Sequence, residues 1–206
     1  MTGFDLLADG DPRLVAGHDL ADAAALLRAA ELEGEGPERF RAEVLAFVAA
    51  HADAALRSCP PGHLTGSALV VDASGTRTLL MLHRKLGRWF QPGGHADGDT
   101  NLAAVALKEA TEETGIAGLR VVLPAVDLDV HRVEPPAEDP HLHLDLRFVV
   151  VAPRGAEEVG NHESLALRWV DEVGLDALDP PVDESTRRLV RRGLAVARAV
   201  LGGGAG

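Results

Sequence analysis

The chain has 206 residues, enough for one well-buried core with an appendage and too few for two large domains. Its apolar fraction of 46% and charged fraction of 25% are those of a globular protein. The net charge of -12 argues against binding to a nucleic-acid backbone, which requires a basic surface. The single cysteine, Cys59, excludes an intramolecular disulfide framework and a multi-cysteine metal site.

The N-terminal residues contain no basic segment followed by an apolar run, so we expect no signal peptide. The longest apolar stretches fall well short of the roughly 20 residues that a membrane span requires. These features predict a soluble, cytoplasmic protein that binds neither nucleic acid nor a membrane.

The first 60 residues are expected to form a helical extension. The run from Asp19 to Ala30 is rich in strong helix formers, and Gly34 to Pro37 interrupts it. Apolar residues then recur three and four positions apart, at Phe40, Val44, Phe47 and Val48. Because Pro60-Pro61-Gly62 ends this pattern, we divide the chain into an extension, residues 1–60, and a domain, residues 61–206.

The domain alternates predicted strands with two predicted helices. Short apolar runs at 67–72 and 76–83 flank a turn and predict a hairpin. A helix is expected from about Asn101 to Thr114, with Gly115 as its stop. Further strands are expected at 119–130, 141–151 and 166–170, and a last helix at 183–201. This order predicts an α/β sandwich with a mixed sheet.

Three glutamates mark the central helix. Glu109, Glu112 and Glu113 stand at positions i, i+3 and i+4 and share one face. Their like charges repel one another, and the helix contains a single basic residue, Lys108. A solvated acidic face explains this pattern. The alternative is a carboxylate cluster that binds Mg²⁺ or Mn²⁺, hard cations that prefer oxygen ligands, and the surrounding spacing favours it.

The segment from Gly94 to Ile116 resembles the Nudix box, G-x5-E-x7-R-E-U-x-E-E-x-G-U, in which U is a bulky aliphatic residue. Both glycines and the last three glutamates are present at the family spacing, and Trp89 to Gly94 resembles the lead-in. Thr100 replaces the first glutamate and Lys108 the arginine, with Asp99 as a candidate substitute for the absent carboxylate. The resemblance covers about residues 61–201 and implies a Nudix-type α/β/α sandwich.

The resemblance also implies a reaction, the metal-dependent hydrolysis of a pyrophosphate bond in a nucleoside diphosphate-linked substrate. Glu109, Glu112 and Glu113 would ligate Mg²⁺ or Mn²⁺ and serve catalysis. Glu163, six residues before Trp169, occupies the place of a further carboxylate that acts as general base or added ligand. Substrate contacts, or else ordinary structural roles, are expected for Arg84, Arg88, Trp89 and Arg147.

The histidines form a second pattern. In the strand at 141–151, strict alternation sends His141, His143, Asp145 and Arg147 to one face and the leucines to the other. With His63 and His95, this set is similar to the metal centre of isopentenyl diphosphate isomerase, a Nudix-fold enzyme. That similarity implies a second, transition-metal site for Zn²⁺, Mn²⁺ or Fe²⁺. Polar residues that contact phosphates are the alternative. The expected ligands are His63, His95, His143 and Asp145.

Two other functions remain open. An isomerase needs a cysteine immediately before Gly94, and this chain has Gly93 there. A non-catalytic nucleotide sensor has little need for all three box glutamates. The sequence does not distinguish a nucleotide sugar, a dinucleotide, a damaged nucleotide or coenzyme A as the substrate, and the N-terminal helices are compatible with a homodimer.

Overall fold

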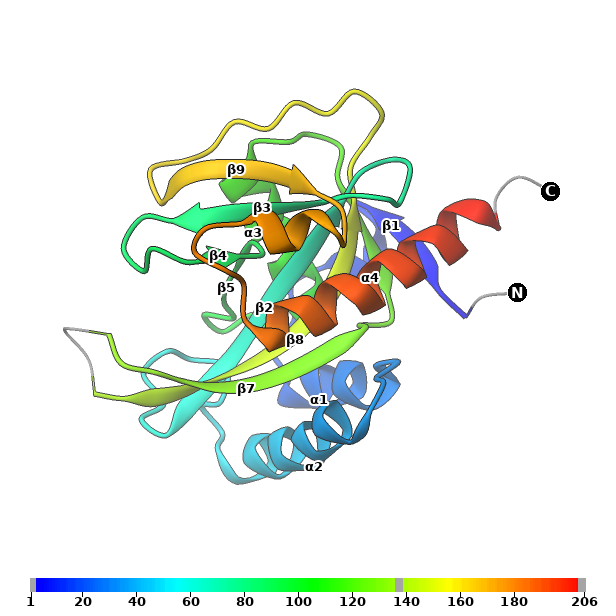
Figure 1. The fold of residues 1–206 in the computed structure, drawn as a ribbon. Coiled ribbons are helices and arrows are strands. Elements are labelled where there is room, and N and C mark those ends of the chain that lie inside the picture. Colours follow the sequence, from blue (N-terminus) through cyan, green and yellow to red (C-terminus); the bar gives the residue numbers. More distant parts are fainter. Residues whose placement is uncertain (1–2, 136–138, 204–206) are drawn as a thin grey trace.

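The structure is a computed structural model that describes residues 3–135 and 139–203. A mixed β-sheet lies at the centre of the molecule, with helices on both of its faces (Figure 1). The strands are β1 (Asp5–Ala8), β2 (Gly62–Val71), β3 (Thr78–His83), β4 (Trp89–Phe90), β5 (Gly93–His95), β6 (Arg120–Leu123), β7 (Asp127–Val133), β8 (His141–Val151) and β9 (Ser164–Val170). The α-helices are α1 (Leu20–Ala29), α2 (Glu35–Ala50), α3 (Leu102–Thr114) and α4 (Glu184–Gly202).

Two long parallel strands organise the sheet. β2 and β8 stay in register from Gly62 opposite Leu142 to Val71 opposite Val151. The other strands pair antiparallel to their neighbours. β5 pairs with the middle of β2 and β3 with its end, while β7 pairs with the first half of β8 and β6 with its end. Strands β5, β2, β8 and β7 therefore lie side by side.

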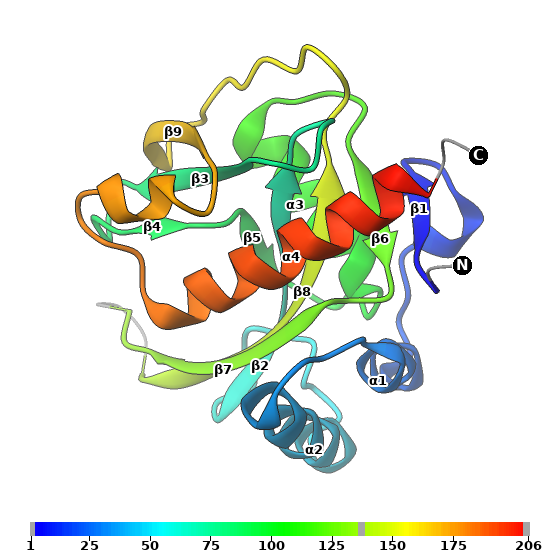
Figure 2. The same ribbon diagram turned by 45° about the vertical axis from the view of Figure 1, so that its right-hand side comes forward.

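The alternation of side chains along β2 and β8 produces two cores. Val71 and Val149 face α4, whereas Ala68, Val70 and Phe148 face the layer that contains α1, α2 and α3. Figure 2 shows α4 crossing one face of the sheet while α1 and α2 lie together below it. The predicted α/β/α sandwich with a mixed sheet is therefore confirmed.

Glycines allow the helices to approach the sheet closely. A Cβ atom at Gly66 of β2 would lie 2.6 Å from the carbonyl oxygen of Leu102 in α3. At Gly193 of α4, a Cβ atom would overlap the side chain of Leu69. Helix α3 thus lies against the backbone of β2 at Gly66, and the missing side chain at Gly193 lets α4 accommodate Leu69 of the same strand.

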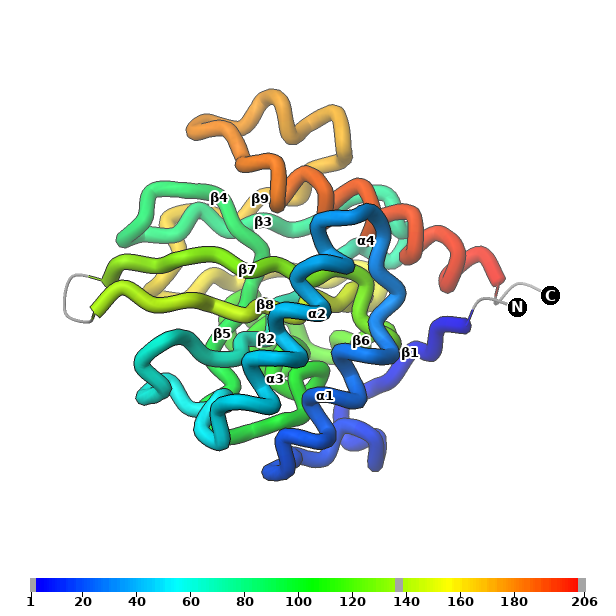
Figure 3. Tube along the Cα trace, turned by 90° about the horizontal axis from the view of Figure 1, so that it is seen from below, coloured from blue at the N-terminus to red at the C-terminus, as the bar shows by residue number. Residues whose placement is uncertain are grey.

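Most predicted helices and strands are confirmed, but the strand expected at 119–130 is wrong. Asn101 caps α3, and Gly115 ends it in the left-handed conformation with φ of 66°. The single strand expected at 119–130 is instead two strands, β6 and β7, because Pro124 follows β6 and the chain turns there. Residues 1–60 contain α1 and α2 as expected, which run side by side in Figure 3.

The same segment also contains a strand that the helical expectation missed. β1 pairs with β6 from Asp5 opposite Leu123 to Ala8 opposite Arg120, so it belongs to the central sheet. A boundary near residue 60 stays a prediction. No described helix is long and apolar enough to cross a membrane.

Candidate active site

Strand β5 and helix α3 bring the box residues together. Leu102, Ala106 and Ala110 of α3 are fully buried in the core. This packing turns the face with Glu109 and Glu113 toward the glycines of β5. A Cβ atom at Gly94 would lie 2.5 Å from Cδ of Glu109, so this carboxylate occupies the space that any larger residue would fill.

Glu113 is the most buried of the box glutamates, with 6% of its surface exposed. Its Oε2 accepts a hydrogen bond of 3.1 Å from the backbone N–H of Gly93. Burial raises the pKa of Glu113 to about 8 against the opposing effect of this hydrogen bond, and the charges of Glu109, Glu163 and Glu112 raise it further. The charges that act most strongly on this carboxylate are therefore those of other carboxylates.

The other carboxylates surround Glu113. Burial raises the pKa of Glu109, and although Nζ of Lys108 lies 3.5 Å from Oε1 and opposes this rise, Glu112 and Glu163 reinforce it. Glu112 and Glu163 are exposed at the edge of the group. The charge of Glu163 acts on both buried glutamates, and its role as general base or added ligand stays a prediction. Four carboxylates therefore converge on one region.

Arg84 holds the turn that contains Glu163. Its guanidinium donates to the carbonyl oxygens of His162 and Ser164 at 2.9 and 3.1 Å, and its backbone N–H donates to that of Glu163 at 2.7 Å. The side chain of Asn161 accepts from the N–H of Glu163 at 2.8 Å. Arg84, expected at the phosphates, thus positions the turn.

The oxygen-rich donor set fits a divalent cation. Carboxylates of like charge at short range are stabilised when a hard cation neutralises them, and Mg²⁺ or Mn²⁺ accepts such oxygens together with water. Glu109, Glu112 and Glu113 are the residues that would hold it.

Thr100 and Lys108, the two residues that depart from the Nudix box pattern, lie in different environments. Thr100 is buried, and a Cβ atom at Gly17 would lie 2.6 Å from its Oγ1. Lys108 has 64% of its side chain exposed. Asp99, the candidate substitute, instead accepts hydrogen bonds of 2.9 Å from the backbone N–H groups of Gly17 and Asn101. Its carboxylate therefore connects the N-terminal loop to the start of α3.

Two further residues expected at the substrate have structural contacts. Trp89 is buried, and its Nε1 donates to the carbonyl oxygen of Asp179 at 3.1 Å. It therefore packs in the core, and the expectation that it stacks on a base is corrected. Arg88 is exposed and pairs with Asp183 at 2.9 Å, which ties the loop before β4 to the N-cap of α4.

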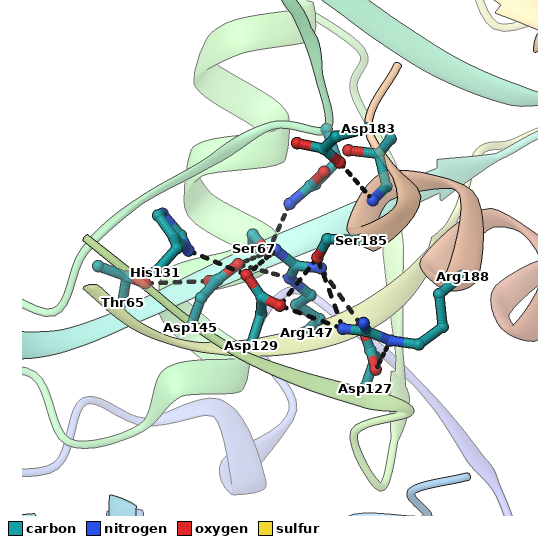
Figure 4. Close-up of polar contacts among 12 residues, drawn as sticks. Thr65, Ser67, Asp127, Asp129, His131, Asp145, Arg147, Asp183, Ser185 and Arg188 are labelled. Atoms are coloured by element: carbon teal, nitrogen blue, oxygen red, sulfur yellow. Dashed lines mark hydrogen bonds and ion pairs between the residues drawn. The ribbon is translucent and has the colours of Figure 1, made fainter. Parts of the chain in front are cut away.

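Arg147 is the centre of a buried ionic network on the face of the sheet that α4 covers (Figure 4). Only 4% of it is exposed, and its guanidinium pairs with Asp145 at 2.8 Å, Asp129 at 3.2 Å and Asp127 at 3.3 Å. Burial alone would lower the pKa of Arg147, but the three aspartate charges outweigh it and raise the pKa. The expectation that Arg147 contacts a phosphate is corrected, because three carboxylates already neutralise it.

Asp145 also differs from its expected role. One carboxylate oxygen accepts from Oγ1 of Thr65 at 3.0 Å, and the other accepts from Oγ of Ser67 and Nε of Arg147, both at 2.8 Å. Both oxygens of the Asp145 carboxylate thus already accept hydrogen bonds. Asp145 is therefore not among the residues whose ligand atoms come within metal-binding distance of the histidines.

The predicted histidines do come together. One candidate ligand atom from each of His63, His95 and His143 lies within 4.8 Å of those from the other two. Burial lowers the pKa of His63 to about 4, with further lowering by His95 and His141. Burial likewise lowers the pKa of His143 to about 3, with contributions from neighbouring imidazoles. Both rings are therefore neutral at pH 7 and retain the lone pairs that a metal ligand needs.

Strand β7 supplies residues that the sequence reasoning missed. Asp127 and Asp129 join the Arg147 network, and Arg188 of α4 contacts both of them at 3.0 to 3.2 Å. Burial alone would raise the pKa of Asp129, but the hydrogen bond with His131 and the charge of Arg147 outweigh burial and lower this pKa. The polar residues at 127, 129 and 131 alternate as in β8, a signal that the strand expected at 119–130 obscured.

Comparisons with known proteins agree with this geometry. A family model described as the NUDIX domain matches residues 63–192. Over 126 residues the chain is 34% identical to a Mycobacterium tuberculosis protein named "Putative 8-oxo-dGTP diphosphatase 3", which covers 56% of this chain and 55% of that protein. The chain thus spans about half the length of this relative.

Two solved structures share the fold. A NUDIX family hydrolase from Clostridium perfringens is 20% identical, with a TM-score of 0.50, and the match covers 65% of this chain and 97% of that one. A NUDIX hydrolase from Alicyclobacillus acidocaldarius is 17% identical, with a TM-score of 0.50, and the match covers 68% and 94% of the two chains. At these identities the likeness concerns the fold alone. The family model covers most of the chain, and the chain therefore belongs to the Nudix family.

Proposed function

We propose that this protein hydrolyses a pyrophosphate bond in a nucleotide substrate with the help of divalent cations. The observation that carries the proposal is that Glu113 and Glu109 lie against the backbone of Gly93 and Gly94. The charges of Glu112 and Glu163 act on both of these buried carboxylates. A structural role does not explain why a glutamate is buried among other carboxylates with a raised pKa. A site that gathers cations does.

The expected cation is Mg²⁺ or Mn²⁺, held by Glu109, Glu112 and Glu113. When bound, such a cation neutralises phosphate charge and lowers the pKa of coordinated water. The protein fixes the carboxylates before the substrate arrives. Gly94 leaves space for Glu109, and the N–H of Gly93 orients Glu113.

Glu163 is the proposed general base. It is exposed, and the turn that carries it is held by Arg84 and Asn161. It lies near enough to Glu109 and Glu113 to raise the pKa of each. A carboxylate fixed at the edge of the cluster is suited to accept the proton of a water molecule that attacks a phosphorus atom.

An oxidised purine nucleoside triphosphate is the first substrate to test, because the M. tuberculosis relative is named for 8-oxo-dGTP. The relative matches over about half of its length, so the substrate is proposed at the level of a class. Nucleotide sugars, dinucleotides and coenzyme A belong in the same panel. Each contains a pyrophosphate linkage that these carboxylates and their cations would recognise.

Gly93 argues against an isomerase. A Cβ atom at this position would lie 2.5 Å from Cβ of Ser67, so the strand pairing of β5 with β2 leaves no space for a cysteine. The three box glutamates that are present, Glu109, Glu112 and Glu113, argue against a non-catalytic sensor. A transition-metal ion at the histidines would use different residues and is a separate proposal.

The test is a screen of nucleoside diphosphate and triphosphate derivatives with Mg²⁺ or Mn²⁺. We expect turnover of at least one compound, and a loss of at least about 100-fold in Glu112→Gln and Glu163→Gln. Glu43→Gln, an exposed glutamate of α2, is the matched control and should retain wild-type activity. Absence of turnover across the panel, or glutamine variants as active as the wild type, would refute the proposal.

A further inference from the structure

Five histidines from four adjacent strands gather on one face of the sheet. Their positions follow from the pairing, since His63 of β2 and His131 of β7 both stand opposite His143 of β8, and His95 of β5 pairs with the next residue on that face of β2, Thr65. The fifth, His141, lies two residues before His143 and so shares its face.

The imidazole rings are close together. The ring centroid of His63 lies 4.8 Å from those of His95 and His141 and 5.0 Å from that of His143. His143 lies 5.1 Å from His95, 5.4 Å from His141 and 5.5 Å from His131. His63 and His143 therefore form the centre of the group, and each contacts several other imidazoles.

The ring nitrogens of His63 are buried without a hydrogen-bond partner in the described part of the chain. The exposed fraction of His63 is 1%, and neither Nδ1 nor Nε2 has a hydrogen-bond partner among the residues that the structure describes. A buried polar group without a partner is costly, and native proteins rarely retain one without an ion, a water molecule or a function. The packing of a core histidine does not explain this arrangement.

The two other histidines of the group, His131 and His141, have hydrogen-bond partners outside it. Nδ1 of His131 lies 3.1 Å from a carboxylate oxygen of Asp129, and Nδ1 of His141 lies 2.8 Å from the carbonyl oxygen of Asp139. Because both partners are acceptors, each Nδ1 is the donor in its contact. Metal-binding histidines commonly have such second contacts.

We propose that His63, His95 and His143 bind a transition-metal ion of the Zn²⁺ class. Their nitrogen ligand atoms lie within 4.8 Å of one another, a spacing that three ligands of one ion can adopt with small side-chain rotations. Imidazole nitrogen favours Zn²⁺ and similar ions over Mg²⁺. The fourth ligand of the ion would be water or the imidazole of His131 or His141.

The proposed ion would connect three strands. It would join β2, β8 and the short strand β5, whose Gly93 and Gly94 contact Glu113 and Glu109. Bound only to the folded protein, it would raise the melting temperature. This site has nitrogen ligands on strands, whereas the proposed hydrolytic site has oxygen ligands on α3, so the two are separable by experiment.

The test is titration of the metal-stripped protein with Zn²⁺ and, as a spectroscopic probe, with Co²⁺ in excess Mg²⁺. We expect a single Zn²⁺ per chain, the visible absorption of four-coordinate cobalt, and a higher melting temperature with Zn²⁺. His95→Gln and His143→Gln should each bind at least about tenfold more weakly. The exposed His18→Gln should bind like the wild type.

The wild-type titration together with His95→Gln and His143→Gln decides the proposal even if a His63→Gln variant fails to fold, because His51, Asp53 and Cys59 form a second group that could hold an ion. Absence of the cobalt absorption and of bound Zn²⁺ would overturn it, as would wild-type affinity in folded His95→Gln and His143→Gln. Glu112→Gln should lose hydrolysis and retain the cobalt spectrum. If the hydrolysis proposal fails, the metal titration is unaffected, so the two failures are distinguishable.

Discussion

The backbone N–H of Gly93 donates a hydrogen bond of 3.1 Å to Oε2 of Glu113. This contact joins the short strand β5 to the last turn of α3, and the neighbouring Gly94 leaves room for the carboxylate of Glu109. The two glycines therefore position two of the three box glutamates through the backbone. Substitutions on either side of this contact should affect the same site.

The contribution of Glu113 to the stability of the metal-free protein should fall as the pH rises. The pKa of Glu113 is raised from 4.5 to about 8 by folding, so the folded state retains this proton over a range in which the unfolded chain loses it. The stabilisation is complete below about pH 4.5 and is lost as the pH approaches 8. The free energy of unfolding should decrease by about 1.4 kcal/mol per pH unit in this window from this group alone.

The variant Glu113→Gln tests whether Glu113 causes this pH dependence of stability, because glutamine cannot ionise. Denaturant unfolding in chelator should be compared between pH 7 and pH 8, above the range in which His63 and His143 change the stability. Over this window the variant should show a smaller decrease in stability than the wild type. Adding Mg²⁺ should reduce the decrease in the wild type, since the cation stabilises the carboxylate. Equal pH slopes for the two metal-free proteins would contradict the assignment.

Gly94→Ala should damage catalysis and preserve the fold. The new Cβ would lie 2.5 Å from Cδ of Glu109, and the carboxylate would have to move. A displacement of about 1 Å at a catalytic group reduces activity by about 100-fold. Steady-state kinetics and Mg²⁺ titration measure the effect. Gly36→Ala, where a Cβ meets nothing within 4 Å, is the control, and equal activity of both variants would refute the role of Gly94.

Restoring the family glutamate with Thr100→Glu should destabilise the protein. Thr100 is buried against Gly17, and an unpaired carboxylate there costs several kcal/mol. Adding Lys108→Arg should not rescue it, because Lys108 points to solvent with 64% of its side chain exposed. Thr100→Val should have little effect on stability, since Oγ1 has no hydrogen-bond partner among the described residues. Wild-type stability of Thr100→Glu in thermal unfolding would show that this packing is not required.

Arg147→Met should reduce stability by about 3–5 kcal/mol, because it leaves buried aspartates without their cation. Chemical denaturation measures this loss. The exposed Arg13→Met, which breaks surface pairs with Asp5 and Asp11, should lower the stability far less. If Arg147→Met kept its stability and lost substrate affinity, Arg147 would have the phosphate-binding role that its burial argues against.

The sequence predicted those features that depend on local pattern and spacing. The helix α3 was foreseeable from its apolar positions, its cap at Asn101 and its stop at Gly115. The grouping of Glu109, Glu112 and Glu113 followed from helical periodicity, and their relation to Gly94 from the box spacing. Alternation in β8 correctly placed His143 on the polar face.

What the sequence did not reveal depends on pairing between distant strands. Asp145 and Arg147 share a face with His143, but the register with β7 brings Asp127 and Asp129 against them and neutralises the arginine. β1 escaped prediction because four residues provide too short a pattern and its partner β6 lies more than 100 positions away. Trp89 has a polar and an apolar end, so its sequence context did not determine whether it packs or binds.

The central claim is tested most directly by the rate of hydrolysis of the best substrate in the panel as Mg²⁺ is titrated, for the wild type and for Glu112→Gln. We predict no turnover in chelator, a saturable rise in rate with Mg²⁺, and a large loss of rate and of Mg²⁺ affinity in the variant. Hydrolysis that persists in chelator, or a Glu112→Gln titration that overlays the wild type, would contradict the assignment of these glutamates as the cation-binding residues.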